Sequence, residues 1–508
     1  MGVLIVGSGI VGSTLALALS RQKVPVHLID AFSKTSASLP LSRLSQNQEV
    51  TLSPGSLSIF KLLGLDTHFF QKGYTVSGLK IHFSTSHMID IALTTLGTSF
   101  SSFVTLPEKE ILEGISKASG IKVASDKLES LTSSSKGVEA IFKTEKGSVK
   151  KTFDYVIGCD EGQEKIAALL SLETQKTSEK NLLRVLEVNY ESPLCTQSEI
   201  HLADEKEFLG SVPLSEKKIR LIIQSASLRE GRLTLETLNE FLDQRSTTSL
   251  KATKILTQKN VIGQPQTSPN LPEGPVLVCG RPDFYDISRL NFGYDLDIHQ
   301  ALHLGYHLGQ KLSGNRLSLE TYHKEQVSFQ TCERQNRKIM SELIFSKIPV
   351  YFTLRKNVLP FFLRLPFLIQ KLGRRFAALD VAYRVWANTK DEILHFLSRP
   401  FILGKGDMAP DVPLTTHDGK NSSLYHLLGE KQPIAFVFSD KTPVELDFSD
   451  LASKPQKTFW ISSFLNSPRN DVFQDVDGQA FEKYSIKGRS VLYIVRTDGH
   501  ILERRILF

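Results

Sequence analysis

The first thirty residues alternate between apolar runs and one glycine-rich turn. Residues 3–6 form a short apolar run of the kind that makes a buried strand, and residues 10–19 carry apolar side chains at helical spacing. A second apolar run, residues 24–29, ends in Asp30. The pattern predicts a strand, a turn, a helix and a second strand, in that order.

The middle of the chain is richer in strands. Residues 78–103 alternate between apolar and polar positions, and residues 180–262 combine strand-like runs with polar turns. Two further runs, residues 138–142 and 153–157, flank a turn of lysine and glycine, and we expect them to pair as antiparallel strands. Two separate stretches, approximately 80–105 and 180–262, are expected to build one mixed sheet.

A buried-strand run at residues 276–279 precedes a strong helix pattern at residues 298–312. Three histidines share one face of this helix: His299, His303 and His307. Histidines at that spacing are able to bind a metal ion, but no cysteine or carboxylate pattern accompanies them. Because leucines occupy the apolar face, we predict a solvated histidine face and no metal site.

The last third of the chain changes character twice. Residues 338–403 are basic and apolar, and prolines divide them into short helical pieces. We expect a helical linker folded on the main body, and a segment lying on a membrane surface is the alternative. Residues 404–508 alternate short strands and turns, which predicts a small separate α/β domain after a first domain at residues 1–337.

The composition is that of a globular protein of two or three domains, with 41 % hydrophobic and 23 % charged residues in a chain of 508. The net charge of +7 is modest and no basic block with interleaved aromatic residues occurs, so we expect no nucleic-acid partner. The chain lacks an apolar run of about 18 residues, so we expect no transmembrane segment, and its start does not resemble a signal peptide.

The four cysteines are widely spaced and form no C-x-x-C pair: Cys159, Cys195, Cys279 and Cys332. This spacing argues against a zinc site or a dithiol centre. It favours a reducing compartment, and we expect a cytoplasmic protein.

The glycine-rich turn has the spacing of a dinucleotide-binding fingerprint. Gly7 permits a tight turn, Gly9 lets the backbone approach a pyrophosphate, and Gly12 lets the helix pack close to the strand. The helix N-terminus offers unpaired N–H groups and a positive dipole end to the phosphates. Asp30 lies 18 residues beyond Gly12, near the spacing at which a carboxylate accepts from ribose hydroxyls. The turn predicts a bound nucleotide without distinguishing NAD from FAD.

The order of these features resembles that of the FAD-dependent aromatic hydroxylases, the flavin monooxygenases of the para-hydroxybenzoate and phenol hydroxylase type, over almost the whole chain. Residues 7–12 and Asp30 match the family's ADP-binding fingerprint. Arg43 resembles a family arginine that lies near the flavin. Asp160 resembles the aspartate of a second motif, a strand that ends in Cys-Asp-Gly.

The third family motif, to which residues 276–308 align, departs from the pattern. The family's Gly-Asp pair, whose carboxylate meets the ribityl chain of FAD, is Gly280-Arg281 here. If the flavin pocket is retained, Asp283 or Asp286 would take over that contact.

The loop that packs against the flavin ring in the family is also altered. Leu290 and Asn291 replace two glycines that allow backbone contact with the ring, while Gly293 is retained. Glu161 stands where glycine is usual, and Glu108 where glutamine is usual. The half of the site that binds ADP is therefore intact, and the flavin half has changed.

The resemblance implies an α/β architecture: a Rossmann-type FAD-binding domain with an inserted mixed-sheet substrate domain, a helical linker and a C-terminal thioredoxin-like domain, which here contains no cysteine. The residues expected to bind the cofactor are Gly7, Gly9, Ile10, Val11, Gly12, Asp30, Arg43, Asp160, Gly280, Arg281 and Gly293.

The function that the resemblance implies is an FAD-dependent monooxygenase, an oxidoreductase in which NADH or NADPH reduces the flavin and O₂ is used to hydroxylate an aromatic or related small molecule. The alternative is a catalytically degenerate nucleotide-binding or interaction protein on the hydroxylase scaffold. An NAD-only dehydrogenase is disfavoured because the order along the whole chain is that of the flavoproteins. The sequence assigns no residue to catalysis. A homodimer and weak peripheral membrane contact are compatible with it and stay open.

Overall fold

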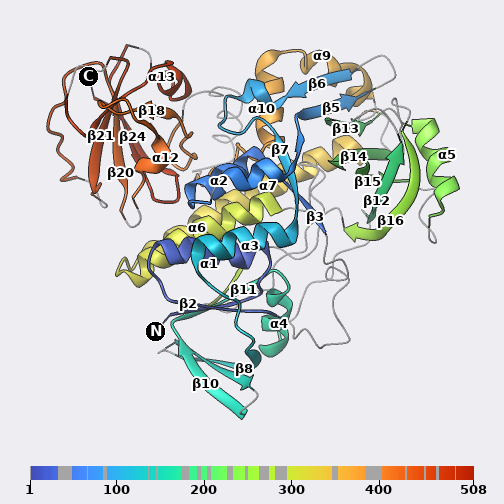
Figure 1. The fold of residues 1–508 in the computed structure, drawn as a ribbon, viewed down its shortest axis with the longest axis horizontal. Helices are drawn as coiled ribbons and strands as arrows, with labels where there is room; N and C mark the ends of the chain where they lie inside the picture. Colours follow the sequence, from blue (N-terminus) through green and yellow to red (C-terminus); the bar gives the residue numbers. More distant parts are fainter. Residues whose placement is uncertain are drawn as a thin grey trace.

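The computed structural model (Figure 1) describes residues 2–31, 48–65, 67–83, 88–134, 137–144, 147–172, 182–191, 196–202, 207–225, 233–245, 250–262, 274–280, 294–345, 350, 353–384, 403–429, 432–450, 454–464, 468–486 and 488–507. Its N-terminal part is built around a four-stranded parallel sheet. In sheet order the strands are β17 (Val276–Cys279), β11 (Tyr155–Cys159), β1 (Val3–Val6) and β2 (Val26–Ile29).

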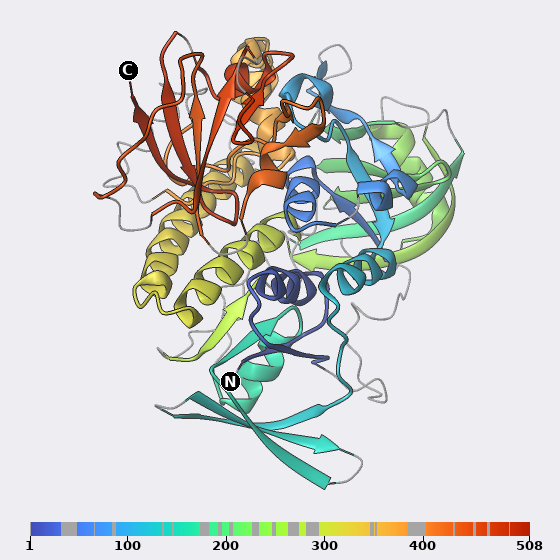
Figure 2. The same ribbon diagram turned by 60° about the vertical axis from the view of Figure 1, so that its left-hand side comes forward.

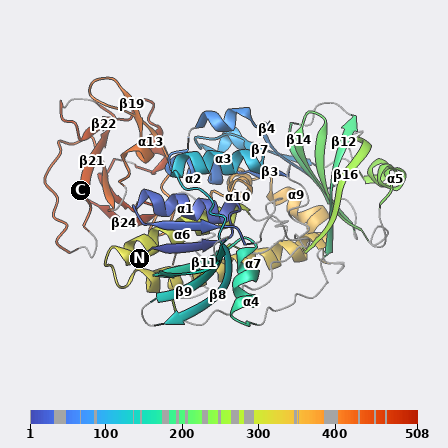
Figure 3. The same ribbon diagram turned by 60° about the horizontal axis from the view of Figure 1, so that its bottom comes forward.

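Both faces of this parallel sheet are covered, which explains why its strands are apolar runs. Helices α1 (Ile10–Arg21) and α6 (Tyr294–Leu312) pack on one face. Gly305 permits their close approach, because a Cβ there would lie 2.7 Å from the Cβ of Ala18. The other face is covered by four elements, partly visible in Figure 3: β8 (Lys127–Ser134), β9 (Gly137–Thr144), β10 (Gly147–Phe153) and α4 (Gly162–Leu169).

The predicted antiparallel pairing of residues 138–142 with 153–157 is wrong. Strand β9 pairs instead with β10, and β11 joins β1 and β17 in parallel. The physical reason lies in burial, since Val156 through Cys159 are all buried. A strand that is buried on both faces belongs in a parallel sheet, whereas β9 and β10 form a hairpin with one exposed side.

Two distant stretches of chain combine in a seven-stranded mixed sheet. Its order is β16 (Lys251–Ile262), β12 (Leu182–Glu191), β15 (Lys218–Gln224), β14 (Phe208–Ser215), β13 (Ser198–His201), β5 (Gly78–His82) and β6 (Met88–Ala92). The stretches meet where β13 and β5 pair in parallel. Helix α5 (Leu235–Arg245) packs on one face of this sheet.

A small sheet and two helices connect the two large sheets. The sheet contains β3 (Glu49–Leu52), β7 (Phe103–Pro107) and β4 (Tyr74–Val76), and the helices are α2 (Pro54–Leu62) and α3 (Glu108–Ser119). Two 3₁₀ turns, η2 (Thr67–Lys72) and η3 (Leu93–Leu96), lie in the same part of the chain.

The chain continues from α6 into helices that lead to the C-terminal part. These are α7 (Ser318–Phe345), a short π-helical turn η5 (Leu354–Val358), α9 (Leu359–Phe362) and α10 (Pro366–Phe376). Pro360 and Pro366 lie in the first turns of α9 and α10, where proline is tolerated. Leu363 and Phe376 are buried against the seven-stranded sheet, so this segment folds on the main body. Residue 337, the predicted end of the first domain, lies inside helix α7, which continues to Phe345.

The C-terminal part contains a second seven-stranded sheet. In sheet order its strands are β19 (Asn421–Ser423), β18 (Pro413–Thr415), β22 (Val472–Gln474), β21 (Lys457–Ser462), β20 (Ile434–Phe438), β23 (Val491–Val495) and β24 (Ile501–Ile506). The short helices α12 (Leu424–Leu427) and α13 (Gln479–Lys483) flank it. The thioredoxin-like assignment of this part stays a prediction.

The C-terminal sheet is docked firmly on the rest of the molecule (Figure 2). Leu57 and Phe60 of α2 share one hydrophobic core with Leu424 and Phe436 of the C-terminal part. None of the helices in the ranges given above is long and apolar enough to cross a membrane.

Candidate functional site

The four strands of the parallel sheet end at one edge, and the predicted nucleotide-binding residues follow those ends. Gly7 follows β1, Asp30 follows β2, Asp160 follows β11 and Gly280 follows β17. Parallel strands carry their carboxyl ends on the same side, where ligands of open α/β sheets bind. The fold therefore brings together residues that lie up to 273 positions apart in the sequence.

The glycine turn is packed so closely that its glycines are sterically required. Gly7 has a φ of +110°, and a Cβ there would lie 1.9 Å from the carbonyl oxygen of Cys159. A Cβ at Gly12 would lie 1.9 Å from the carbonyl oxygen of Gly7. Because neither position carries a Cβ, the N-terminus of α1 packs tightly over the strand ends, which is the geometry that a phosphate-binding turn needs.

The carboxylate of Asp160 lies at the N-terminus of α1. Its Oδ2 accepts from the Gly12 backbone N–H at 3.0 Å and its Oδ1 from the Val11 N–H at 3.3 Å. A Cβ at Gly9 would lie 2.6 Å from the Asp160 Cγ, so Gly9 leaves the room that this carboxylate occupies. Asp160 adopts a left-handed φ of +49°, a strained conformation that aspartate tolerates better than most residues.

The carboxyl group of Asp160 changes its charge near neutral pH. Removal from water raises the pKa of its carboxyl to about 7, and the carboxylates of Glu161 and Glu108 add to the shift. The N–H donors of Gly12 and Val11 oppose it. A proton is therefore held or released at this position near physiological pH, beside the helix end that would face a phosphate.

The turn after β17 closes on the same helix end. Gly280 has a φ of +82°, and a Cβ there would lie 3.1 Å from a methyl group of Val11. Its N–H donates to Oε1 of Gln300 on α6 at 3.3 Å, and the Gln300 amide donates to the Tyr322 hydroxyl of α7 at 3.3 Å. Gly280 thus ties the third sequence motif to α1, α6 and α7.

Part of the predicted site falls outside the described residues. These positions are Arg43, Arg281, Asp283, Asp286, Leu290, Asn291 and Gly293. Their roles, and the assignment of the ribose to Asp30, stay predictions.

Asp295, which the sequence analysis did not single out, holds two helices together beside this site. It lies buried in the first turn of α6, and its Oδ1 accepts from the Ser53 N–H at 3.1 Å and from the Ser53 and Ser56 hydroxyls at 2.7 and 2.5 Å. Ser53 is also the N-cap of α2 and accepts from the Ser56 N–H. The Ser-Pro-Gly-Ser sequence at the start of α2 indicates a helix N-terminus. It does not indicate that a buried carboxylate, Asp295, accepts from its serines.

A buried ion pair lies on the seven-stranded sheet where β3 meets it. The Arg220 guanidinium donates to Oε1 of Glu187 at 2.7 Å and to the Glu49 carbonyl oxygen at 2.6 Å. Burial raises the pKa of the Glu49 carboxyl, and Lys218 opposes the shift. This network joins the seven-stranded sheet to β3 of the small sheet, and the alternation of apolar and polar residues did not predict it.

The predicted solvated face of histidines on α6 is wrong. His299, His303 and His307 are all buried, because α7 and the C-terminal part cover that face. His303 Nε2 lies 2.6 Å and His307 Nε2 lies 3.2 Å from Oε2 of Glu325 on α7. The sequence pattern of α6 did not predict this burial, because the residues that cover its histidines lie far along the chain.

Comparison with known proteins matches residues 1–330 to the model of a family described as an FAD binding domain. The chain belongs to this FAD-binding family. No relative among curated protein sequences matches it at a significant level.

The fold is also that of solved flavoprotein hydroxylases. The chain resembles the anhydrotetracycline hydroxylase OxyS from Streptomyces rimosus, with a TM-score of 0.70 and 17 % identity over 99 % of this chain and 95 % of that one. It resembles the flavin-dependent monooxygenase PieE, solved with FAD and substrate, with a TM-score of 0.66 and 15 % identity over 99 % and 96 % of the two chains. It resembles the Diels-Alderase PyrE3 of pyrroindomycin biosynthesis with a TM-score of 0.67, at 15 % identity over 99 % and 96 %.

Proposed function

We propose that this protein is an FAD-dependent monooxygenase that uses NADH or NADPH as reductant and hydroxylates an aromatic small molecule. The observation that carries the proposal is the convergence of Gly7, Asp30, Asp160 and Gly280 at one sheet edge within a chain of the FAD-binding family. A non-catalytic protein on this scaffold is not favoured, because the family match covers the first domain.

The residues at the sheet edge fit the ADP part of FAD. The turn formed by residues 7–12 and the N-terminus of α1 would hold the pyrophosphate, and Asp30 would accept from the ribose hydroxyls. FAD would supply the redox chemistry that side chains lack. The protein's own contribution is to bind, to orient and to exclude water, and Asp160 would hold or release a proton beside the pyrophosphate.

The substrate class is inferred from the names of two proteins that share the fold. One neighbour in fold hydroxylates anhydrotetracycline, and another is an aromatic hydroxylase from angucycline biosynthesis. We therefore propose an aromatic substrate for this chain.

The proposal is tested with purified protein reconstituted with FAD. We expect NADH or NADPH oxidation that consumes O₂ and rises when a panel of phenols and polycyclic aromatics is supplied, with a product that carries one added oxygen atom by mass spectrometry. Loss of that product without O₂ is the control. A protein that binds FAD but oxidises neither nicotinamide cofactor would contradict the proposal.

We further propose weak contact with anionic membrane surfaces through α9 and α10. Phe361 and Phe367 are 67 % and 42 % exposed, and Arg364 lies between them in the chain. Aromatic side chains beside a cation favour the interface of an anionic bilayer. We expect co-flotation with phosphatidylserine vesicles but not with phosphatidylcholine vesicles, and loss of flotation in a Phe361→Ser, Phe367→Ser variant. Equal flotation of that variant would contradict the proposal.

We also propose that the protein forms a homodimer through its C-terminal part. We propose a cytoplasmic location for it. Sedimentation equilibrium is the test, and a species of 56.8 kDa at all concentrations would exclude the dimer.

A further inference from the structure

Two histidines and a glutamate converge on the seven-stranded sheet, remote from the nucleotide-binding edge. His82 ends β5, and Glu199 and His201 lie on β13, the strand that pairs with β5 in parallel. His82 and His201 are register partners, so their side chains share one face of the sheet. Glu199 lies two residues before His201 and projects from the same face.

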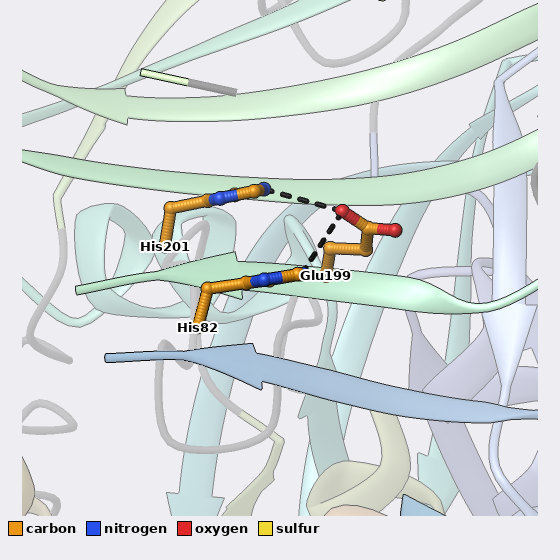
Figure 4. Close-up of side chains that lie close together, drawn as sticks. All are labelled: His82, Glu199 and His201. Atoms are coloured by element: carbon orange, nitrogen blue, oxygen red, sulfur yellow. Dashed lines mark ion pairs between the residues drawn. The ribbon is translucent and has the colours of Figure 1, made fainter. Parts of the chain in front are cut away.

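The three side chains are buried and point toward one another (Figure 4). The imidazole rings of His82 and His201 stack with centroids 4.4 Å apart and an angle of 3° between their planes. Oε2 of Glu199 lies 3.3 Å from Nε2 of each ring, and one oxygen serves both. All three residues are buried, with exposed fractions of 6 or 7 %.

The two distances of 3.3 Å between Oε2 and the Nε2 atoms match those between ligands of one metal ion. Charge-assisted hydrogen bonds between nitrogen and carboxylate oxygen are typically about 2.7–2.9 Å long, shorter than the two distances of 3.3 Å seen here. Two ligands bound to tetrahedral Zn²⁺ at about 2.0–2.1 Å are separated by roughly 3.3–3.4 Å. The three ligand atoms lie within 4.8 Å of one another, so one ion is able to reach all of them.

A second group of the same composition provides a contrast. His303, His307 and Glu325 also lie within reach of one ion, but Arg496 occupies that place. Its Nη1 lies 3.2 and 3.1 Å from the two Glu325 carboxylate oxygens. That carboxylate already has a permanent cation, so an added metal ion would be repelled.

Among the residues that the structure describes, no lysine or arginine forms an ion pair with the carboxylate of Glu199. Lys80 is its register partner on β5, and no ion pair joins Lys80 to Glu199 in the part of the chain that the structure describes. A buried carboxylate needs a compensating charge, and between two imidazole nitrogens that charge fits a divalent ion.

We propose that His82, Glu199 and His201 bind one divalent transition-metal ion, with Zn²⁺ as the best match to two imidazoles and one carboxylate. The ion would join β5 to β13, the contact that unites the two distant stretches of the sheet. His201 faces Leu209 in register, which belongs to the core beneath α5, whereas Ile81 and Ile200 belong to the core beneath the linker helices. The metal site therefore lies on the opposite face from that core, and its role is to stabilise the sheet.

The test uses full-length, tag-free protein treated with EDTA and then titrated with Zn²⁺ in isothermal calorimetry. We expect one equivalent bound with micromolar or tighter affinity, and a rise of a few degrees in the unfolding temperature when Zn²⁺ is present. Glu199→Gln and His201→Ala should each weaken binding at least about tenfold. His27→Ala is the matched control, because His27 pairs with the carboxylate of Asp126 at 2.9 Å but belongs to neither metal-ligand group among the described residues. This variant should leave Zn²⁺ binding unchanged.

Binding well below one equivalent, or equal Zn²⁺ affinity in Glu199→Gln, would overturn the proposal. If the variants do not fold, X-ray absorption of the Zn²⁺-loaded wild-type protein decides. Scattering from two imidazoles without sulfur supports the site, and sulfur scattering or the absence of imidazole overturns it. These measurements need neither FAD nor turnover, so they are independent of the monooxygenase proposal.

Discussion

Asp160 places a carboxylate among backbone N–H groups that a dinucleotide phosphate also uses. Its oxygen atoms accept from Val11 and Gly12 in the first turn of α1. Two anions at one helix end repel each other, unless one of them carries a proton. A pKa of about 7 for Asp160 makes that choice depend on pH within the physiological range.

We therefore expect the FAD affinity of the wild-type protein to fall as the pH rises from 6 to 8. Above pH 7 the carboxyl is ionised beside the pyrophosphate, and the expected loss is roughly threefold to tenfold. Asp160→Asn cannot ionise, so its affinity should be nearly independent of pH. Fluorescence titration of FAD at three pH values measures both slopes, and a wild-type affinity that rises with pH would contradict the role given to Asp160.

At the residue scale the sequence predicted the glycines well and the polar partners poorly. At Gly7 and at Gly12 a Cβ atom would lie 1.9 Å from a backbone carbonyl oxygen, so both positions require glycine. The roles of Asp295 and Glu325 depend on what α2 and the C-terminal part bring to them. Such pairings across more than a hundred residues leave no local pattern.

At the element scale, α2 and α6 are joined by one buried carboxylate. Asp295 accepts hydrogen bonds from three donors at the N-terminus of α2. Its negative charge is also stabilised by the positive end of the α6 dipole. This link therefore holds the N-terminus of α2 against the N-terminus of α6.

Asp295→Ala should reduce the free energy of unfolding by about 2–4 kcal/mol, because the Ser53 N–H is left buried with no acceptor. Ser56→Ala removes only one of the three donors and should cost about 1 kcal/mol. Urea unfolding followed by circular dichroism measures both values. Equal stability of wild-type protein and Asp295→Ala would show that the link contributes nothing.

The sequence also predicted elements better than their partners. The runs at residues 3–6 and 276–279 form strands as expected, whereas β11 was assigned to the wrong neighbour. Hydrophobic periodicity reports which faces of a strand are buried. It does not report which strand lies beside it, and that is decided by the whole sheet.

At the scale of the whole molecule, a buried polar cluster joins the FAD-binding part to the C-terminal part. Arg496 and Asp498 of the β23–β24 turn form an ion pair at 2.8 Å, and Arg496 also binds Glu325 of α7. His303 stacks on Tyr383 with ring centroids 3.6 Å apart. The cluster fixes the position of the C-terminal part.

Arg496→Met should destabilise the protein by about 3–5 kcal/mol, because two buried carboxylates lose their cation. Arg469→Met is the control, since the Arg469–Asp471 pair of the same part of the chain is exposed and should contribute nothing measurable. Thermal and urea unfolding give the comparison. A similar stability for the two variants would contradict the importance of the cluster.

The titratable groups of this cluster should make the stability of the protein depend on pH. Burial lowers the pKa of His303 to about 3, with His307 and Arg496 adding to the shift and Glu325 opposing it. Burial disfavours the ionised Glu325, but hydrogen bonds from His303 and His307 and the charge of Arg496 hold its pKa below the usual range. For both groups the unfolded chain takes up protons more readily than the folded protein as the pH falls.

The cluster should therefore lower the free energy of unfolding as the pH falls from 7 to 5, at up to about 1.4 kcal/mol per pH unit for each proton taken up, whereas protonation of Asp160, whose pKa is about 7, acts in the opposite direction. His303→Gln should show a shallower slope, and the exposed His417→Gln should keep the wild-type slope. Urea unfolding at pH 5, 6 and 7 measures the slopes, and an equal slope in His303→Gln and the wild-type protein would contradict the neutral, buried state of His303.

The central claim is that the sheet edge binds FAD that NADH or NADPH is able to reduce, and a visible spectrum tests it most directly. We predict that the purified protein takes up one FAD per chain, with a flavin band at about 450 nm that bleaches when NADH or NADPH is added. Gly9→Val, whose side chain would meet the Asp160 carboxylate and the pyrophosphate, should take up none. A wild-type protein that stays colourless with excess FAD would contradict the account.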